Sequence, residues 1–491
     1  MTGNFILAID QGTTGTTALL LDENMDVRGK GYREIPQSYP APGWVEHDPE
    51  EIWRSVLAAV TEARDRAGAV SIAGIGITNQ RETVVCWDRE TGRAVAPAIV
   101  WQDRRTAGQC AALREAGVEP TFQKSTGLLL DPYFSGTKIA WLLHNVAGLR
   151  QRAESGEVAF GTIDSFLVWR LSGGKSLITD VSNASRTLLF DIGSLDWNPE
   201  LCRLLAVPAA ALPRVVPSSG NLAATLGMDG LADGTPIAGI AGDQQAALFG
   251  QGCWKRGDAK CTFGTGSFLL MNVGAKPIAS RHRLLATVAW QTSAGTDYAL
   301  EGSAFVSGAL VQWLRDGLHI IKTAAEIESL AASVPDAGGV AIVPALAGLG
   351  APHWRPEARG MICGISRGTT AAHIARAALE AMALQNVDLV RAMERDAGQP
   401  ITSLRVDGGA TANGLLMQIQ ADLLGTDIIR PAMVESTALG AGLLAARGIG
   451  LESSPAKAPN LKASVFSPGM PPAEREQRMA RWREALARCG K

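Results

Sequence analysis

A short glycine–threonine turn occurs twice in the chain, each time between two apolar runs that are typical of strands. Gly12-Thr13-Thr14 lies near the start, and Gly264-Thr265-Gly266 follows 252 residues later. A unit repeated over such a distance predicts a chain of two similar halves, each with its own sheet. A motif this small can also recur by chance, so the prediction depends on what surrounds the two turns.

Signals for strands and helices alternate along the chain, which predicts a mixed α/β fold. Asp48-Pro49-Glu50-Glu51 predicts a helix start, because Asp can cap, Pro fits the first turn and Glu suits the positive end of the helix dipole. Apolar residues then recur at helical spacing up to Gly68, a typical stop. Strands are expected at 5–10, 18–21, 72–77, 83–87 and 94–101.

The Gly-rich stretch 250–257 is the expected boundary between the halves. It divides the chain into an N-terminal lobe, residues 1–250, and a C-terminal lobe, residues 251–491. Near the end, residues 455–472 are rich in Pro and Ser and are expected to form a surface tail, followed by a helix over 473–488.

The composition is that expected of a globular protein inside the cell. With 46 basic and 48 acidic residues and no run of either, the chain has no electrostatic footprint for nucleic acid or a membrane surface. The longest bland apolar stretch, 338–352, is too short to span a bilayer, and no basic segment precedes the first apolar run. Seven cysteines without a C-x-x-C pair, and six dispersed histidines, predict free thiols in a reducing cytoplasm and no zinc site.

Two common nucleotide-binding motifs are absent from the sequence. Gly174-Lys175-Ser176 resembles the end of a P-loop, but Trp169 occupies the position of the first glycine, and no G-x-G-x-x-G occurs. The glycine turns offer another route, since their backbone N–H groups and threonine hydroxyls can approach phosphate oxygens. A third turn, Asp407-Gly408-Gly409-Ala410, could lie against an adenine ring, and it precedes a helix expected to carry Asn413. Singly, each turn is more often only a turn.

Two aspartates are candidates for phosphoryl transfer, which needs Mg²⁺ and a group that accepts the proton of the attacking hydroxyl. Asp10 ends the strand before the first turn, and Asp243 follows an apolar run in Ala241-Gly242-Asp243-Gln244-Gln245. The alternative for Asp243 is a helix cap.

The adjacent Arg81 and Glu82 offer the fixed donors and acceptors that a small polyol needs. The alternative for this couple is a surface ion pair. Trp101 and Tyr133 could wall such a site along the carbon chain of a polyol, or they could belong to the core.

Long words spread over nearly the whole chain, from Asp10 to about Gly442, resemble the FGGY family of carbohydrate kinases and, within it, the glycerol kinases. The words that carry the resemblance are Asp10–Thr14, Pro42–Pro49, Ile77–Thr83, Trp101–Thr106, Asp131–Lys138, Asn183–Thr187, Gly242–Gln251, Gly264–Gly266, Trp313–Asp316, Gly360–Ile365 and Arg405–Ala410. Asn79-Gln80-Arg81-Glu82 in particular resembles the glycerol enzymes and not the pentulose kinases. The resemblance implies a two-lobed, actin-like (ribonuclease H-like) ATPase fold with the site in the central cleft. It also implies ATP- and Mg²⁺-dependent phosphorylation of glycerol to sn-glycerol 3-phosphate, the first step of glycerol catabolism.

By the same resemblance, Asp243 would be the general base, and Asp10 and Asp243 would hold Mg²⁺ largely through water. The residues that would bind glycerol are Arg81, Glu82, Tyr133, Asp243 and Gln244, with Trp101 and Phe268 on its carbon face. Those that would bind the nucleotide are Thr13, Thr14, Gly15, Thr17 and Thr265 at the phosphates, and Gly308, Gln312, Gly409 and Asn413 at the nucleoside. An assembly of two or four copies is a further expectation.

The sequence departs from the family pattern in three places. Gly15-Thr16-Thr17 stands where many glycerol kinases carry Ser-Ser-Arg, so Thr17 cannot make the arginine's cationic contact with phosphate. Either nucleotide affinity is altered or another cation substitutes. His353 stands where tyrosine is common. Asp233-Gly234-Thr235-Pro236 lacks the arginine that enterobacterial relatives use for fructose 1,6-bisphosphate, so inhibition by that ligand is expected to be weak or absent.

Two rival functions stay open from the sequence. One is a kinase of the same family that acts on another polyol or on a ketose. The other is an ATP-driven binding protein on the same fold, like actin or a heat-shock chaperone. That class would share the phosphate turns but lack a polyol pocket, so Arg81, Glu82, Trp101 and Tyr133 favour the kinase.

Overall fold

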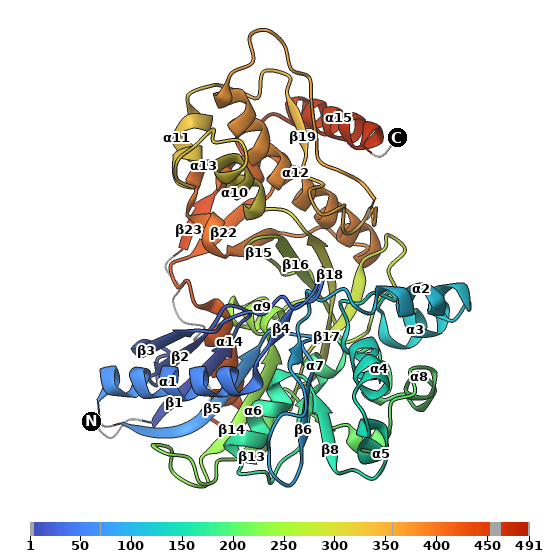
Figure 1. Cartoon of the computed structure of the whole chain (residues 1–491). Coiled ribbons are helices and arrows are strands. Elements are labelled where there is room, and N and C mark those ends of the chain that lie inside the picture. The colour runs from blue at the N-terminus through green and yellow to red at the C-terminus, as the bar shows by residue number, and fades with distance from the viewer. Residues whose placement is uncertain (1–3, 69, 356, 452–462, 490–491) are drawn as a thin grey trace.

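Two mixed β-sheets organise the chain into two lobes, stacked one above the other in Figure 1. The computed structural model describes residues 4–68, 70–355, 357–451 and 463–489. The first sheet has the order β13-β14-β5-β1-β2-β3 and the second β17-β18-β16-β15-β21-β22-β23. The first sheet consists of β1 (Asn4–Gln11), β2 (Gly15–Leu21), β3 (Val27–Glu34), β5 (Ser71–Asn79), β13 (Ser219–Ala224) and β14 (Pro236–Gly242). The second consists of β15 (Ala259–Phe263), β16 (Ser267–Gly274), β17 (Leu285–Thr292), β18 (Gly295–Ala304), β21 (Ser403–Asp407), β22 (Asp427–Pro431) and β23 (Ala463–Phe466).

The two sheets share one arrangement of five strands. In the first lobe β1 pairs antiparallel with β2 and parallel with β5, and these pair in turn with β3 (antiparallel) and β14 (parallel). In the second lobe β15 pairs antiparallel with β16 and parallel with β21, and these pair in turn with β18 (antiparallel) and β22 (parallel). Gly12-Thr13-Thr14 turns the chain between β1 and β2, and Gly264-Thr265-Gly266 does so between β15 and β16. The predicted repeat of a strand–turn–strand unit in two α/β halves is therefore confirmed.

Alternating side chains on β1 place the first sheet between two layers of helices. Leu7 and Ile9 pack with α1 (Pro49–Ala67) and α6 (Ile163–Leu171) on one face. Ile6 and Ala8 pack with α9 (Asp243–Gly250) and α14 (Ser436–Gly448) on the other. By the same alternation Asp10 lies on the face of α9 and α14.

Helix α1 has the ends that its sequence predicts. Asp48 caps it by accepting a hydrogen bond from the Glu50 N–H at 2.9 Å, and Gly68 ends it with a positive φ of 80°. The apolar residues at helical spacing between them are buried.

Helix α14 comes late in the chain but packs on the first lobe, where it is the red helix among the blue strands of Figure 1. The approach is close: a Cβ on Gly440 would lie 1.8 Å from the carbonyl oxygen of Ala246, and one on Gly76 would lie 2.1 Å from that of Ala441. A larger side chain at Gly76 would push α14 off the sheet, and one at Gly440 would push it off α9. The proposed division of the chain into lobes at 250/251 therefore applies to the strands only, because α14 returns to pack on the first lobe.

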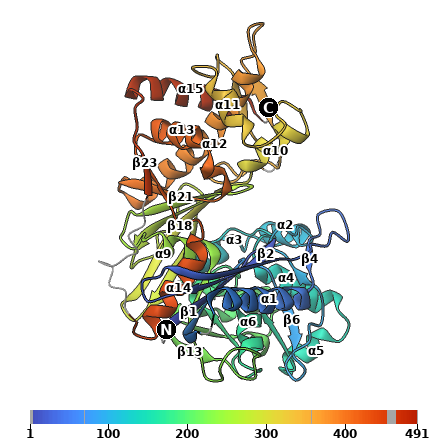
Figure 2. The same ribbon diagram turned by 90° about the vertical axis from the view of Figure 1, so that its left-hand side faces the viewer.

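The main helices of the second lobe pack on the side of its sheet that faces away from the first lobe (Figure 2). They are α10 (Gly308–Asp316), α12 (Ala371–Ala397), α13 (Gly414–Leu424) and α15 (Pro472–Arg488). The last helix is confirmed at its predicted place. The prediction of a plain surface tail before it is wrong for 463–466, because this run pairs with β22 as strand β23. The rest of that prediction, up to residue 462, falls outside the described residues.

The strand predicted over 94–101 is also wrong in extent. Only β7 (Ala98–Ile99) forms there, since Pro97 has no N–H to donate to a ladder. All seven cysteines are free thiols, and six of them are buried. Within the described ranges, none of the helices is both long and apolar enough to cross a bilayer.

Candidate active site

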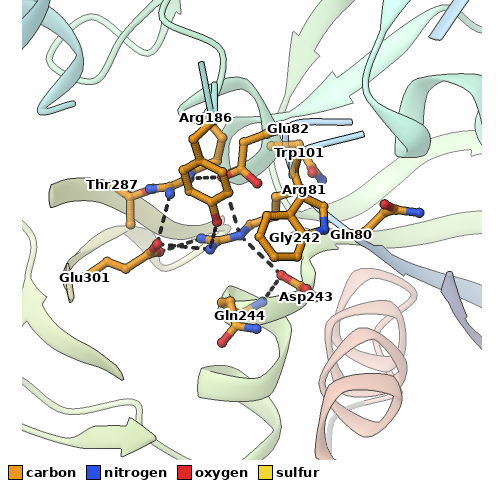
Figure 3. A network of polar contacts seen from close by, with 12 residues as sticks. Gln80, Arg81, Glu82, Trp101, Arg186, Gly242, Asp243, Gln244, Thr287 and Glu301 are labelled. Atoms are coloured by element: carbon orange, nitrogen blue, oxygen red, sulfur yellow. Dashed lines mark hydrogen bonds and ion pairs between the residues drawn. The ribbon is translucent and has the colours of Figure 1, made fainter. Parts of the chain in front are cut away.

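The polar residues predicted to bind a polyol gather between the two sheets, where β5, α9 and β18 meet (Figure 3). Arg81 and Glu82 directly follow β5, Asp243 begins α9, and Glu301 reaches in from β18 of the second lobe. Arg81 and Glu82 are only 2% and 1% exposed. The alternative of a surface ion pair is therefore wrong.

Each N–H of the Arg81 guanidinium faces an acceptor. Nη1 donates to Glu301 Oε2 at 2.5 Å and Nη2 to Glu301 Oε1 at 3.0 Å. Nη1 also donates to Gln245 Oε1, and Nη2 to the Tyr133 hydroxyl, both at 3.3 Å. Nε lies 3.2 Å from Asp243 Oδ1. The guanidinium thus joins a carboxylate of the second lobe to one of the first.

A second arginine completes this buried network. Arg186 Nε donates to Glu82 Oε1 at 2.6 Å, and its Nη2 donates to Glu301 Oε1 at 2.9 Å. Burial alone would raise the pKa of Glu301, but Arg186 and Arg81 hold it at about 2. For Glu82 burial wins, so its pKa is raised although Arg81 and Arg186 attract its charge. The two arginines and two glutamates offset one another's charge away from water.

Asp243 is the one of these carboxylates that reaches solvent, with 30% of its side chain exposed. Burial raises its pKa above the ordinary value, while Arg81 and Lys260 pull it down. The cap position of α9 is Gly242, so the helix-cap alternative for Asp243 is wrong. Lys260, on β15, donates to Gln244 Oε1 and to Thr262 Oγ1, the latter at 2.8 Å.

Three aromatic rings form an apolar wall beside the network. Trp101 packs edge to face on Tyr133, with ring centroids 5.7 Å apart, and on Phe268 of β16, with centroids 6.3 Å apart. The Trp101 Nε1–H donates to Thr13 Oγ1 at 2.9 Å. The wall therefore connects the residues predicted to bind a polyol to the first glycine turn, Gly12-Thr13-Thr14.

Asp10 is partly buried and makes no side-chain hydrogen bond or ion pair with any residue that the structure describes. Burial raises its pKa well above the ordinary value, and the negative charges of Asp243 and Glu435 raise it further. An unpaired carboxylate beside a second one is a fit for a divalent cation. The described ranges contain no group of three or more His, Cys, Asp or Glu placed to hold a metal alone. That arrangement suits Mg²⁺, which keeps water and phosphate oxygens as most of its ligands.

The first glycine turn, Gly12-Thr13-Thr14, is closed by a hydrogen bond within its own backbone. The Gly12 N–H donates to the Gly15 carbonyl at 2.9 Å. A Cβ on Gly15 would lie 2.6 Å from the Arg33 carbonyl oxygen, so a side chain there would displace β3. Thr14 is exposed, and Thr17 faces Asp10 across the hairpin.

The second turn is held against the start of α10. The Gly264 N–H donates to Gly266 at 2.8 Å, the Ser307 N–H to the Thr265 carbonyl at 2.8 Å, and the Gly308 N–H to Gly264 at 2.9 Å. Since α10 begins at Gly308, its positive end lies beside the exposed Thr265.

The other nucleoside candidates lie around the same edge of the second lobe. Gln312 is exposed one turn after Gly308, and Gly409 is exposed directly after β21. Asn413 is not on a helix as predicted. A 3₁₀ turn, Gly409–Ala412, intervenes, and Asn413 caps α13 by accepting from the Leu416 N–H at 2.8 Å.

A cavity of about 1030 Å³ lies elsewhere in the first lobe and does not include these residues. It is lined by the segments 46–50, 89–97 and 169–174. Arg170 and Glu50 in its wall pair with each other at 2.7 Å. None of the polar residues that converge between the two sheets lines this cavity.

Sequence reasoning missed three charged residues of the network. Lys260 is the one charge in the apolar strand β15, and Glu301 stands in the buried part of β18, so a charge within a buried run is the signal that could have found them. Arg186 lies within one of the words shared with the family, but no role was drawn from it.

Comparison with known proteins places these features in one family. Residues 5–250 match the model for the N-terminal domain of the FGGY family of carbohydrate kinases, and residues 259–449 match the C-terminal domain. The glycerol kinase of Alkalilimnicola ehrlichii is 57% identical over 489 residues, covering 99% of this chain and 98% of that protein. The one from Trichlorobacter lovleyi is 60% identical over 452 residues, covering 91% and 90%. The crystal structure of Plasmodium falciparum glycerol kinase with ADP superposes with a TM-score of 0.94 at 34% identity, over 100% of this chain and 99% of that one.

Proposed function

The chain belongs to the FGGY family of carbohydrate kinases, and we infer that it transfers the γ-phosphoryl group of ATP to a terminal hydroxyl of glycerol. The fold is the two-lobed, actin-like one of that family. The enzyme is an ATP-dependent kinase acting on an alcohol acceptor. The products are sn-glycerol 3-phosphate and ADP.

One observation carries the choice of glycerol: full-length similarity to glycerol kinases coincides with a site that is charged on one side and aromatic on the other. Glycerol has the same two sides, three hydroxyls and a short carbon chain. Arg81, with Glu82 and Asp243, would bind the hydroxyls. Trp101 and Phe268 would pack on the carbon chain, with Tyr133 and Gln244 completing the pocket.

Asp243 is the proposed general base. Its side chain is partly exposed, and the pKa raised by burial brings it nearer to neutral, where a base accepts a proton most effectively. Arg81 Nε, 3.2 Å away, would position the same hydroxyl that Asp243 deprotonates.

Asp10 and Asp243 are the residues proposed to hold Mg²⁺, largely through water. When bound there, the ion would neutralise negative charge on the phosphates of ATP. The positive charge of the ion would also favour the ionised forms of both carboxylates, which the protein alone disfavours.

The two glycine turns are proposed to bind the phosphates from opposite lobes. Thr13, Thr14 and Gly15 would do so from the first, and Thr265 from the second, with Thr17 behind. Gly308, Gln312, Gly409 and Asn413 would surround the nucleoside. Drawing the lobes together over both substrates would exclude water, a competing phosphoryl acceptor.

Release of ADP by the purified chain tests the proposal. A panel of glycerol, a pentulose and a sugar acid is compared at equal concentration with ATP and Mg²⁺. We expect turnover with glycerol and much slower ATP hydrolysis without an acceptor. Preference for a ketose would instead support the rival family activity, and acceptor-independent turnover would support an ATP-driven binding protein.

Two further proposals concern the setting of the enzyme. Seven free thiols suit a reducing compartment, so we propose that it works in the cytoplasm. We also propose an assembly of two or four copies, which light scattering on the purified protein tests directly.

A further inference from the structure

Glu301 differs from the other residues of the polyol site in its origin. It lies on β18, in the sheet of the second lobe, whereas Arg81, Glu82 and Asp243 come from the first. It is 1% exposed, so its carboxylate faces the network and not the solvent. In Figure 3 it approaches Arg81 from the side opposite to Asp243. Its position makes it a contact between lobes within the site.

The contacts of the Arg81 guanidinium are unequal. Those with Glu301 form a two-pronged, charge-assisted pair at 2.5 and 3.0 Å. The contact of Nη2 with the Tyr133 hydroxyl, at 3.3 Å, and that of Nε with Asp243, at 3.2 Å, are longer. A ligand hydroxyl can replace a long contact with Asp243 or Tyr133 more readily than the short pair with Glu301.

We propose that Glu301 is a positioning residue for the polyol site: it fixes the Arg81 guanidinium, so that substrate hydroxyls take over the weaker contacts of that guanidinium with Asp243 and Tyr133. The inference rests on the proposed function. Arg186 braces Glu301 from the other side, because Glu301 Oε1 accepts from both arginines. Without Glu301, the Arg81 guanidinium would form a closer ion pair with Asp243, and the base would be less available to the substrate hydroxyl.

The experiment compares Glu301→Gln with the wild type. We expect the KM for glycerol to rise about 10-fold or more, since a charge-assisted pair is lost, while the KM for ATP changes by less than about twofold. Glu301→Asp keeps the charge but shortens the reach, so it should raise the KM for glycerol less than Glu301→Gln does.

Glu380→Gln is the matched control. Glu380 is also a buried glutamate of the second lobe, and it pairs with two arginines, Arg376 and Arg478, far from the site. It should lower Tm as Glu301→Gln does without changing the KM for glycerol.

The outcomes separate the two claims. A wild-type chain without glycerol-dependent ADP release refutes the proposed function. If the wild type is active, a Glu301→Gln variant that loses only Tm shows that Glu301 is merely structural and overturns the inference. Equal rises in both KM values would overturn it as well, because they would mean that the lobes, and not Arg81, are displaced. If Glu301→Gln does not fold, the same criteria apply to Glu301→Asp.

Discussion

The two lobes contain the same unit of strands, but an aspartate occupies a different strand of that unit in each lobe. Asp10 lies one pair before the end of the β1–β2 ladder, and its neighbour on the parallel strand β5 is Thr78. The equivalent pair in the second lobe is reversed, with Thr262 on β15 and Asp407 on β21.

The surroundings of the two aspartates differ as well. Asp10 has no partner among the described side chains, whereas Asp407 Oδ2 accepts hydrogen bonds from Gln251, at 2.7 Å, and from Ser436. One scaffold thus carries a carboxylate without a side-chain partner in the first lobe and a hydrogen-bonded one in the second. The difference fits the proposal that the reacting groups belong to the first lobe.

The largest effect expected from this division of roles is at Asp243. Asp243→Asn should lower kcat by about 10²- to 10⁴-fold, the usual contribution of a general base. The change is isosteric, so Tm should stay near that of the wild type. Steady-state kinetics with both substrates check it, and near wild-type turnover would mean that the base lies elsewhere.

A smaller effect is expected at Arg81, where the lobes meet. Arg81→Ala should raise the KM for glycerol roughly 10- to 150-fold, because a charged hydrogen bond contributes about 1.5–3 kcal/mol, and it should change the KM for ATP little. Arg105→Ala is the control, since Arg105 is equally buried and pairs with Glu46 and Asp103. If ATP binding suffers in Arg81→Ala and glycerol binding does not, Arg81 belongs to the nucleotide site.

The exchanged carboxylates provide the sharpest test of the comparison. Asp10→Asn should raise the Mg²⁺ concentration for half-maximal activity about 10- to 100-fold. Its Tm at neutral pH should rise, because a carboxylate with a raised pKa destabilises the fold once the pH exceeds its unfolded value. Asp407→Asn should instead lower the free energy of unfolding by about 1.5–3 kcal/mol and leave the Mg²⁺ requirement unchanged. The reverse pattern would show that the two lobes have been assigned the wrong way round.

The smallest effect concerns how each turn is held. Trp101→Phe keeps an aromatic ring at this position but loses the hydrogen bond to Thr13, so the KM for ATP should rise about 2- to 10-fold. The second turn is held by backbone groups of α10 and has no such side chain to remove. Trp197→Phe, which loses a bond to the Pro213 carbonyl away from the site, should leave that KM unchanged.

Local signals account for what the sequence predicted of the fold. Asp48, Pro49 and Gly68 define α1 because capping depends on neighbours in the chain. The two glycine turns likewise identify the repeated unit. The strand β23 was missed because its composition is that of a tail, and its pairing with β22 is decided at a distance.

The same distinction explains the candidate site. Arg81, Asp243 and Tyr133 stand in recognisable words, and the structure brings them together. Glu301 was missed because the residue that gives it meaning, Arg81, lies 220 positions earlier in the chain. A charge in a buried part of a strand does not show which partner it contacts.

The return of α14 to the first lobe has a consequence for synthesis on the ribosome. Its residues follow α9 by about 200 positions, so at roughly 5–20 residues per second the first lobe waits some 10–40 s for its last helix. Until then, Ile6 and Ala8 lack the part of their cover that α14 provides. The N-terminal half is thus made first but is completed only after most of the C-terminal half, and a nascent chain stalled after residue 250 presents an apolar surface that a chaperone could hold.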